Sequence, residues 1–159
     1  MADIGIDLGT ATVLVYDSVK GLLIKEPSVV AFKMIGRTPD RIRALYPLKD
    51  GVISDFDQTE QMLRHFLKKA SESTLSKPRV CICVPSGITG VESRACVNAA
   101  VSAGARKVYL IEEPVAAALG AGLDLSVPRG RFILDMGGGT TDIAVLSLNG
   151  IVCKKSIKL

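Results

Sequence analysis

The chain has 159 residues, the length of one domain or of one domain with a small addition. Hydrophobic residues make up 48% and charged residues 23%, which excludes a disordered chain. The net charge of +4 is spread along the sequence, aromatic residues are 4% and Trp is absent, so we expect no nucleic-acid partner. Asp3 stands where a secretory signal needs a basic residue, and apolar runs are too short to cross a bilayer, so we expect a cytoplasmic protein.

Short apolar runs bounded by Gly, Pro and Asp are separated by helical patterns, which is typical of an α/β fold. The first expected helix follows Asp57, with Glu60 completing a capping box, and the second begins at Thr89 with Glu92 in the same spacing. The third has Pro114 at its first position. The expected strands are residues 4–8, 12–16, part of 22–32, 80–84, 107–111, 132–135, 141–147 and 151–157.

An internal repeat is the most informative feature of the sequence. Residues 4–16 and 133–145 share the order strand, Asp, glycine turn, Thr, strand. Such a repeat predicts two similar halves, each of which presents its turn to a shared cleft. Only one more strand is expected after the second copy, so we expect residues 132–159 to be the start of the second half-repeat.

The two turns have the chemistry of a phosphate site. Turns that contain Gly and Thr expose consecutive backbone N–H groups, and no Cβ atom blocks the approach of a phosphate. Asp7 and Asp135 end the strands before these turns, where carboxylates are suited to hold Mg²⁺ directly or through water. Glu112 and Glu113 come directly before Pro114, so one of their carboxylates is expected at the N-terminus of the third helix, near the predicted cleft. There it fits either a water-positioning role or a helix cap. The sequence has no P-loop motif.

These motifs carry a family resemblance. Residues 7–10, 113–114 and 135–140 resemble the first phosphate, connecting and second phosphate motifs of the superfamily of actin, sugar kinases and large heat-shock chaperones. Within that superfamily the chain resembles the bacterial actins of the MreB and Mbl group. The segments that carry this closer resemblance are residues 3–11, 25–31, 36–39, 47–53, 77–80, 84–89 and 108–114.

The resemblance implies an actin-like ATPase (ribonuclease H-like) fold, a site for ATP and Mg²⁺, and self-association into filaments. It also implies a role in wall synthesis and rod shape at the inner face of the cell membrane, with the wall-synthesis machinery as partner. Glu113 would orient the attacking water, and Asp7 and Asp135 would hold the metal through water. The implied nucleotide-binding residues are Asp7, Gly9, Thr10, Ala11, Thr12, Asp135, Gly137, Gly138, Gly139 and Thr140.

Several departures from the family pattern lead to further expectations. Thr12 and Val13 stand where the family has Asn and Thr. The stretch after Phe32 is short, so residues 33–50 are expected to be a remnant of the small second subdomain. We expect residues 1–159 to form the first large domain, with the second truncated and little ATPase activity in the chain alone. The family often inserts an apolar loop into lipid at the place of residues 72–76, but these residues are mostly polar here, and Leu75 alone is too little to anchor a monomer, although many copies on a filament could sum.

Three other functions agree with parts of this sequence. The chain could be a non-catalytic structural fragment of a bacterial actin. A sugar kinase or a chaperone-type ATPase of the same superfamily would share the two hairpins. A sugar kinase would also need a catalytic base in a substrate cleft, and a chaperone would add a substrate domain.

Overall fold

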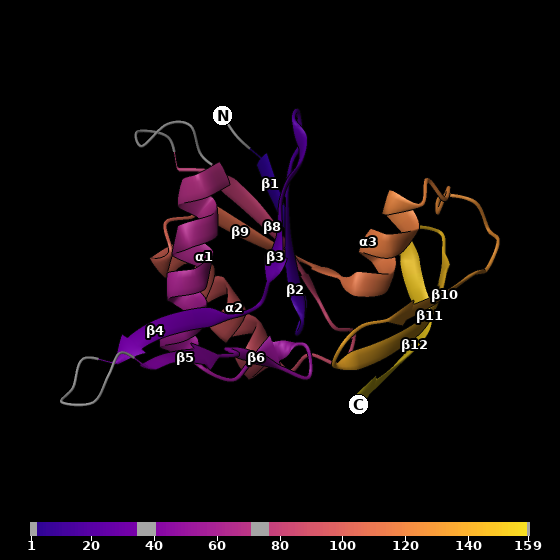
Figure 1. The fold of residues 1–159 in the computed structure, drawn as a ribbon. Helices are drawn as coiled ribbons and strands as arrows, with labels where there is room; N and C mark the ends of the chain where they lie inside the picture. The colour runs from indigo at the N-terminus through magenta and orange to yellow at the C-terminus, as the bar shows by residue number, and fades with distance from the viewer. Residues whose placement is uncertain (1–2, 35–40, 71–76, 159) are drawn as a thin grey trace.

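The computed structural model of the chain describes residues 3–34, 41–70 and 77–158. Figure 1 shows two lobes, a larger one on a five-stranded sheet and a smaller one on a three-stranded sheet with one helix. The family-like segment 36–39 and the expected membrane contact at residues 72–76 lie outside the described residues. Within the described ranges, no helix is both long enough and apolar enough to cross a membrane.

The sheet of the larger lobe has the strand order β3-β2-β1-β8-β9. β1 (Asp3–Leu8), β2 (Thr12–Asp17) and β3 (Gly21–Pro27) form an antiparallel meander, while β8 (Arg79–Val84) and β9 (Lys107–Glu112) run parallel to β1. Side chains along β1 and β8 alternate between buried and half-buried positions, as expected for strands with one face in the core. The sequence predicts a strand at each of these places, and the structure confirms it.

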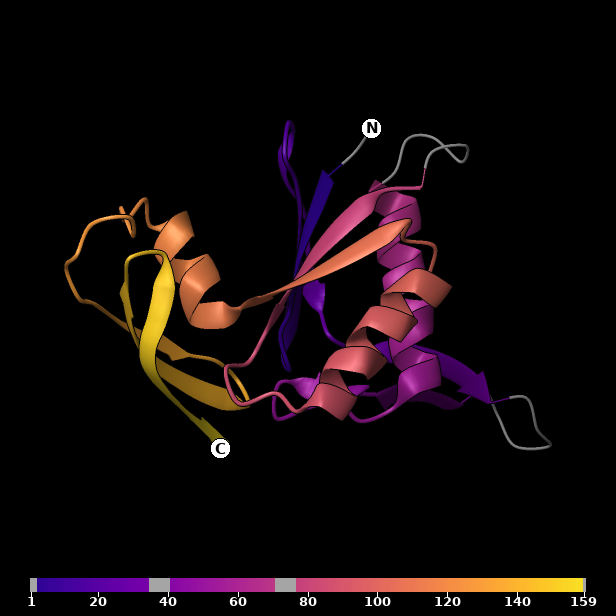
Figure 2. The ribbon, with the colours of Figure 1, turned by 180° about the vertical axis from the view of Figure 1, so that it is seen from behind.

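Helices α1 (Phe56–Ala70) and α2 (Gly90–Ser102) cover one face of this sheet, as Figures 1 and 2 show from opposite sides. Their apolar residues meet those of the strands in one core. The side chains at its centre, each less than 2% exposed, include Ile6, Val13, Val15, Leu63, Val80 and Ile82. This layer fixes the strand ends from which the site is built.

The start of α1 differs from the prediction. Asp55, rather than Asp57, caps the helix, because its carboxylate accepts the N–H of Gln58 at 3.0 Å. Asp57 lies inside the first turn, and Glu60 pairs with Arg64 one turn later instead of reaching back. The sequence fits both starts, since each Asp is followed three residues later by Gln or Glu.

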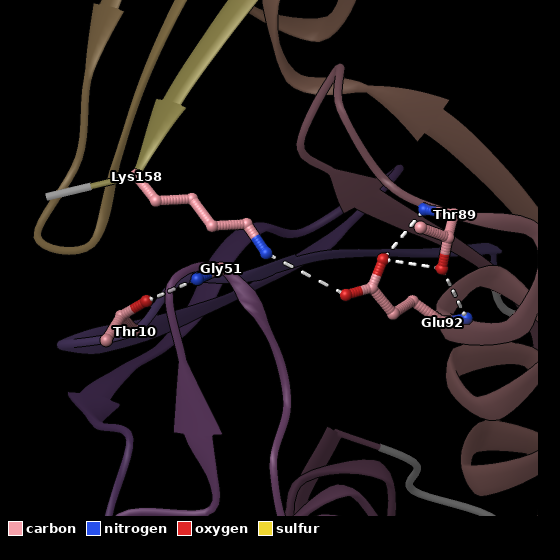
Figure 3. A network of polar contacts seen from close by, with 5 residues as sticks. All are labelled: Thr10, Gly51, Thr89, Glu92 and Lys158. Carbon is pink, nitrogen blue, oxygen red and sulfur yellow. Dashed lines mark hydrogen bonds and ion pairs between the residues drawn. The ribbon is translucent and has the colours of Figure 1, made fainter.

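The predicted capping box of α2 is confirmed. Thr89 Oγ1 accepts the N–H of Glu92 at 3.2 Å, and Glu92 Oε2 accepts the N–H of Thr89 at 2.7 Å (Figure 3). The other oxygen of Glu92 lies 3.9 Å from Nζ of Lys158, at the end of the last strand. The start of α2 therefore also contacts the smaller lobe.

Thr89→Ala should lower the free energy of unfolding by about 1 kcal/mol, because it removes the side chain that caps α2. Urea unfolding measures this change. Ser102→Ala, at an exposed position at the other end of the same helix, is the matched control and should cost nothing. An equal loss in both variants would contradict the capping role.

Two small sheets lie beside the larger lobe. β4 (Val30–Met34) pairs with β5 (Arg41–Leu45), and β6 (Leu48–Lys49) pairs with β7 (Val52–Ile53). The sequence reading missed β5, β6 and β7. The β6–β7 turn has a clear signal, because Asp50-Gly51 is a typical two-residue hairpin turn and both residues have positive φ, 52° and 73°.

The smaller lobe consists of α3 (Glu113–Gly120) and an antiparallel sheet of β10 (Arg131–Met136), β11 (Thr140–Ser147) and β12 (Gly150–Lys158). The chain passes from β9 directly into α3, so Glu113 lies where the lobes join (Figure 1). The helix begins at Glu113, one residue earlier than predicted, so Pro114 is its second residue and not its first. The small core of this lobe contains Ala118, Leu125, Ala144 and Leu146.

Candidate nucleotide site

The turn between β1 and β2 forms one wall of the candidate site. Ser28 holds this turn twice, because its N–H donates to the carbonyl of Ala11 at 3.0 Å and its hydroxyl donates to the carbonyl of Gly9. Thr10 Oγ1 accepts the N–H of Gly51 from the β6–β7 turn at 2.8 Å (Figure 3). Two other segments therefore fix the position of this turn without any ligand.

The turn between β10 and β11, residues 137–139, forms the facing wall. A Cβ atom at Gly138 would lie 3.1 Å from Cβ of Ala11, and one at Gly139 would lie 2.6 Å from Oγ1 of Thr10. None of the three glycines has a positive φ. Glycine is needed here because the two turns approach closely, and not because of an unusual backbone conformation.

A cavity of about 400 Å³ lies between the two turns and the start of α3. The structure brings all the predicted site residues together around this cavity, although they come from segments far apart in the sequence. They are Asp7, Gly9, Thr10, Ala11, Thr12, Glu113, Asp135, Gly137, Gly138, Gly139 and Thr140. The spatial grouping that the repeat predicts is therefore present, while the role of each residue stays a prediction.

The sequence reading missed the other residues that line the cavity. These are Gly51, Cys83, Ala116 and Ala117. Gly51 belongs to the Asp-Gly hairpin signal described above. Ala116 and Ala117 come three and four residues after Glu113 in α3, so they lie on the same face of the helix. Burial, followed by the nearby Asp7, raises the pKa of the Cys83 thiol to about 12, so at neutral pH this thiol is protonated and a poor nucleophile.

The cavity is rich in acids. Burial and then the charge of Asp135 raise the pKa of Asp7, and burial and then Asp142 raise the pKa of Asp135. The pKa of Glu113 rises to about 8, first because of burial and then because of Asp142, Asp7 and Asp135. None of the described residues that line the cavity is a Lys or Arg.

Glu112 and Glu113 are adjacent but have different surroundings. Glu113 lines the cavity, whereas the carboxylate of Glu112 accepts a hydrogen bond from Nζ of Lys154 at 2.7 Å. Lys154 lies on β12, so this pair also joins the lobes. Of these two neighbours, Glu113 therefore lines the cavity and Glu112 pairs with the other lobe, while their roles stay predictions.

The residues present fit a Mg²⁺-bound polyphosphate better than a metal alone. In the described part of the chain, no group of three or more His, Cys, Asp or Glu side chains is arranged to hold a metal. Mg²⁺ is usually bound by one or two carboxylates, with water and substrate phosphates as its other ligands. Asp7 and Asp135 supply such carboxylates, and both glycine turns line the cavity beside them. The N–H of Gly137 already donates to the carbonyl of Thr140 at 2.8 Å, so the other N–H groups of the turns are the candidates for phosphate.

Glu113→Gln should stabilise the empty protein at pH 8.5 relative to the native chain but leave it nearly unchanged at pH 5. Native stability falls as pH rises from about 4.5 to about 8, because the folded state disfavours the charged carboxylate. The full pKa difference corresponds to at most about 5 kcal/mol, and partial exposure reduces our expectation to about 1–2 kcal/mol. Thermal unfolding at both pH values measures the effect. Glu112→Gln is the control, and a gain there would contradict the assignment.

Comparison with known proteins identifies close relatives. The sequence profile of the family described as MreB/Mbl protein matches residues 1–159. Cell shape-determining protein Mbl of Bacillus subtilis (strain 168) is 50% identical over 173 residues, with 99% of this chain and 52% of Mbl covered. Cell shape-determining protein MreB of Pasteurella multocida (strain Pm70) is 48% identical, with 99% of this chain and 51% of MreB covered.

Solved structures agree with these sequence matches. The crystal structure of MreB5 of Spiroplasma citri bound to ADP matches with a TM-score of 0.87 at 38% identity, over 99% of this chain and 52% of MreB5. The crystal structure of the same protein bound to AMPPNP gives a TM-score of 0.85. The chain thus spans about half the length of the curated relatives it matches.

Proposed function

The chain belongs to the MreB/Mbl family of cell shape-determining proteins and has the actin-like ATPase fold, and on this premise we propose that it binds the phosphates and the metal of Mg²⁺-ATP. The observation that carries this proposal is the single cavity between the two glycine turns, with carboxylates at the strand ends. The nucleotide-bound structures of MreB5 support it. The family also favours this reading over a sugar kinase or a chaperone.

Each part of the cavity has a task in this proposal. The backbone N–H groups of the two turns bind phosphate oxygens, and the close approach of the turns leaves no space for a side chain at Gly138 or Gly139. Asp7 and Asp135 would hold the metal, whose charge they balance. The bound Mg²⁺ would neutralise phosphate charge, and Glu113 would orient the water that attacks the terminal phosphate.

We also propose that the protein acts as a filament-forming cytoskeletal ATPase that directs wall synthesis from the inner face of the cell membrane. The names of Mbl and MreB as cell shape-determining proteins support this role, and the family resemblance supports self-association. Sedimentation of the protein with ATP and Mg²⁺, with and without lipid vesicles, tests polymerisation and membrane binding separately.

For the 159-residue chain we expect weak binding of Mg²⁺-ATP, with a Kd of about 1 mM or weaker, and no measurable hydrolysis. The described residues that line the cavity include no aromatic or large apolar side chain on which the adenine base could stack. The phosphates and metal must therefore supply most of the affinity. Titration by two-dimensional NMR should shift the backbone amides of residues 9–12 and 137–140.

One outcome would contradict the proposed site, and another would contradict the expected weak binding. No amide shift in the two turns at about 20 mM Mg²⁺-ATP would remove the cavity as the phosphate site. A Kd in the low micromolar range, or steady release of phosphate, would keep the cavity as the phosphate site but would contradict the expected weakness of the 159-residue chain and show that it is a self-sufficient ATPase. Val19 and Lys20 of the exposed β2–β3 turn, at the opposite end of β2 from the cavity residue Thr12, serve as internal reference amides and should not shift.

A further inference from the structure

Asp142 is a buried acid that the proposed function does not yet use. It lies on β11 directly opposite Asp135 of β10 and is only 1% exposed. Its Oδ1 accepts the N–H of Ser86 at 2.8 Å, from the loop that follows β8 in the larger lobe. This bond joins the lobes at the edge of the cavity. A carboxylate buried to this degree requires more than one hydrogen bond to offset the loss of water.

Two polar atoms at this junction have no hydrogen-bond partner among the described residues. They are Oδ2 of Asp142 and Oγ of Ser86, and both residues are more than nine-tenths buried. The loop has little freedom to move, because a Cβ atom at Gly87 would lie 3.1 Å from Cβ of Ser156 on β12. Buried polar atoms without protein partners are the usual positions of ordered water.

Glu113 lies on the same side of the smaller lobe as Asp142. β11 and α3 pack against each other in the smaller core, and the N–H of Asn149, just after β11, donates to the carbonyl of Leu125, beyond the end of α3, at 2.7 Å. The strand and the helix therefore run in the same direction, and both acids are near the start of their elements. In agreement with this, Asp142 has the largest effect of the three carboxylates that raise the pKa of Glu113.

We propose that Asp142 and Ser86 are positioning residues of the nucleotide site, which together hold one buried water molecule that fixes the carboxyl group of Glu113. The hydrogen bonds balance. The water accepts from the Ser86 hydroxyl and donates its two protons to Asp142 Oδ2 and to a carboxyl oxygen of Glu113, which accepts in either protonation state; this gives the three bonds typical of a buried water. The role of Glu113 in orienting the attacking water rests on the proposed function, but the presence of this water does not.

A crystal structure of the 159-residue chain at about 1.5 Å resolution tests the water directly. We expect density for one water within hydrogen-bond distance of Asp142 Oδ2, Ser86 Oγ and the Glu113 carboxyl. Density that shows Ser86 Oγ bonded directly to Asp142, without this water, would overturn the proposal. No nucleotide is required, so failure of ATP binding and failure of this inference are separate results.

Variants test the positioning role in the same chain. Ser86→Ala keeps the backbone N–H that Asp142 accepts but removes the hydroxyl, so we expect loss of the water and a changed ¹³C chemical shift of the Glu113 carboxyl. Ser86→Thr retains a hydroxyl and should restore the native shift. Ser126→Ala removes an exposed serine that also bonds a carboxylate, that of Asp124, and should change nothing. An unchanged Glu113 signal in the folded Ser86→Ala variant would overturn the proposal.

Discussion

In a chimera in which residues 1–159 replace the segment of Bacillus subtilis Mbl that they match, Glu113→Ala is expected to slow ATP hydrolysis by about 10²–10⁴-fold. The Kd for ATP should change by less than about threefold, because Glu113 is proposed to act on the attacking water and not on the nucleotide. Single-turnover measurements with radiolabelled ATP separate the two effects.

Glu112→Ala is the matched control for this experiment. It removes a neighbouring carboxylate of the same size whose partner is Lys154 and not the cavity. Equal losses of hydrolysis in the two variants would show that the charge or the helix start matters and that Glu113 has no special role. A loss below about threefold for Glu113→Ala would remove it from the reaction.

Most of the residues around the cavity were predictable, because the order of residues within each hairpin and the repeat of that hairpin point to the same site. An Asp at a strand end, followed by a glycine turn and a Thr, specifies a hairpin and its chemistry together. Two copies of this pattern predict two turns that share a cleft, and the close contact of Gly138 with Ala11 confirms this arrangement. The strands of the five-stranded and three-stranded sheets were predictable from local apolar patterns, whereas the short strands β5, β6 and β7 were not.

The supports of the site were not predictable in the same way. The hydrogen bond from Gly51 to Thr10 joins residues 41 positions apart, and that from Ser86 to Asp142 joins residues 56 positions apart. Such contacts depend on tertiary packing, which no local pattern encodes. The repeat does contain one signal for the contact of Asp142. Asp142 occupies the position that Leu14 has in the first copy. An acid in place of an apolar strand residue needs a hydrogen-bond partner if it is buried.

The cap of α1 shows a different limit. Asp55 and Asp57 both satisfy the spacing rule, so the rule alone does not select between them. The structure selects Asp55, whose backbone N–H also donates to the carbonyl of Pro47 at 3.1 Å and so fixes the chain entering the helix. Local rules therefore located the helix, and the hydrogen bonds of Asp55 distinguish its cap from Asp57.

Removal of Mg²⁺ with EDTA should weaken binding of ATP to the 159-residue chain at least about 100-fold, so that the NMR shifts of the two turns disappear. The cavity contains Asp7, Asp135 and Glu113, and no Lys or Arg is among the described residues that line it. A carboxylate about 5 Å from a phosphate charge costs about 3 kcal/mol at an effective dielectric constant of about 20, so free ATP is repelled. A divalent cation between the two reverses this interaction.

The double variant Asp7→Asn, Asp135→Asn tests whether the two carboxylates cause this dependence on the metal. It removes both charges while keeping side chains of similar size, so the difference between binding with Mg²⁺ and binding with EDTA should largely vanish. Asp124→Asn, an exposed acid bonded to Ser126 and absent from the cavity lining, should keep the native difference. Equal binding of ATP by the native chain with and without Mg²⁺ would contradict the assignment, because the turns alone would then have to overcome the repulsion of the acids beside them.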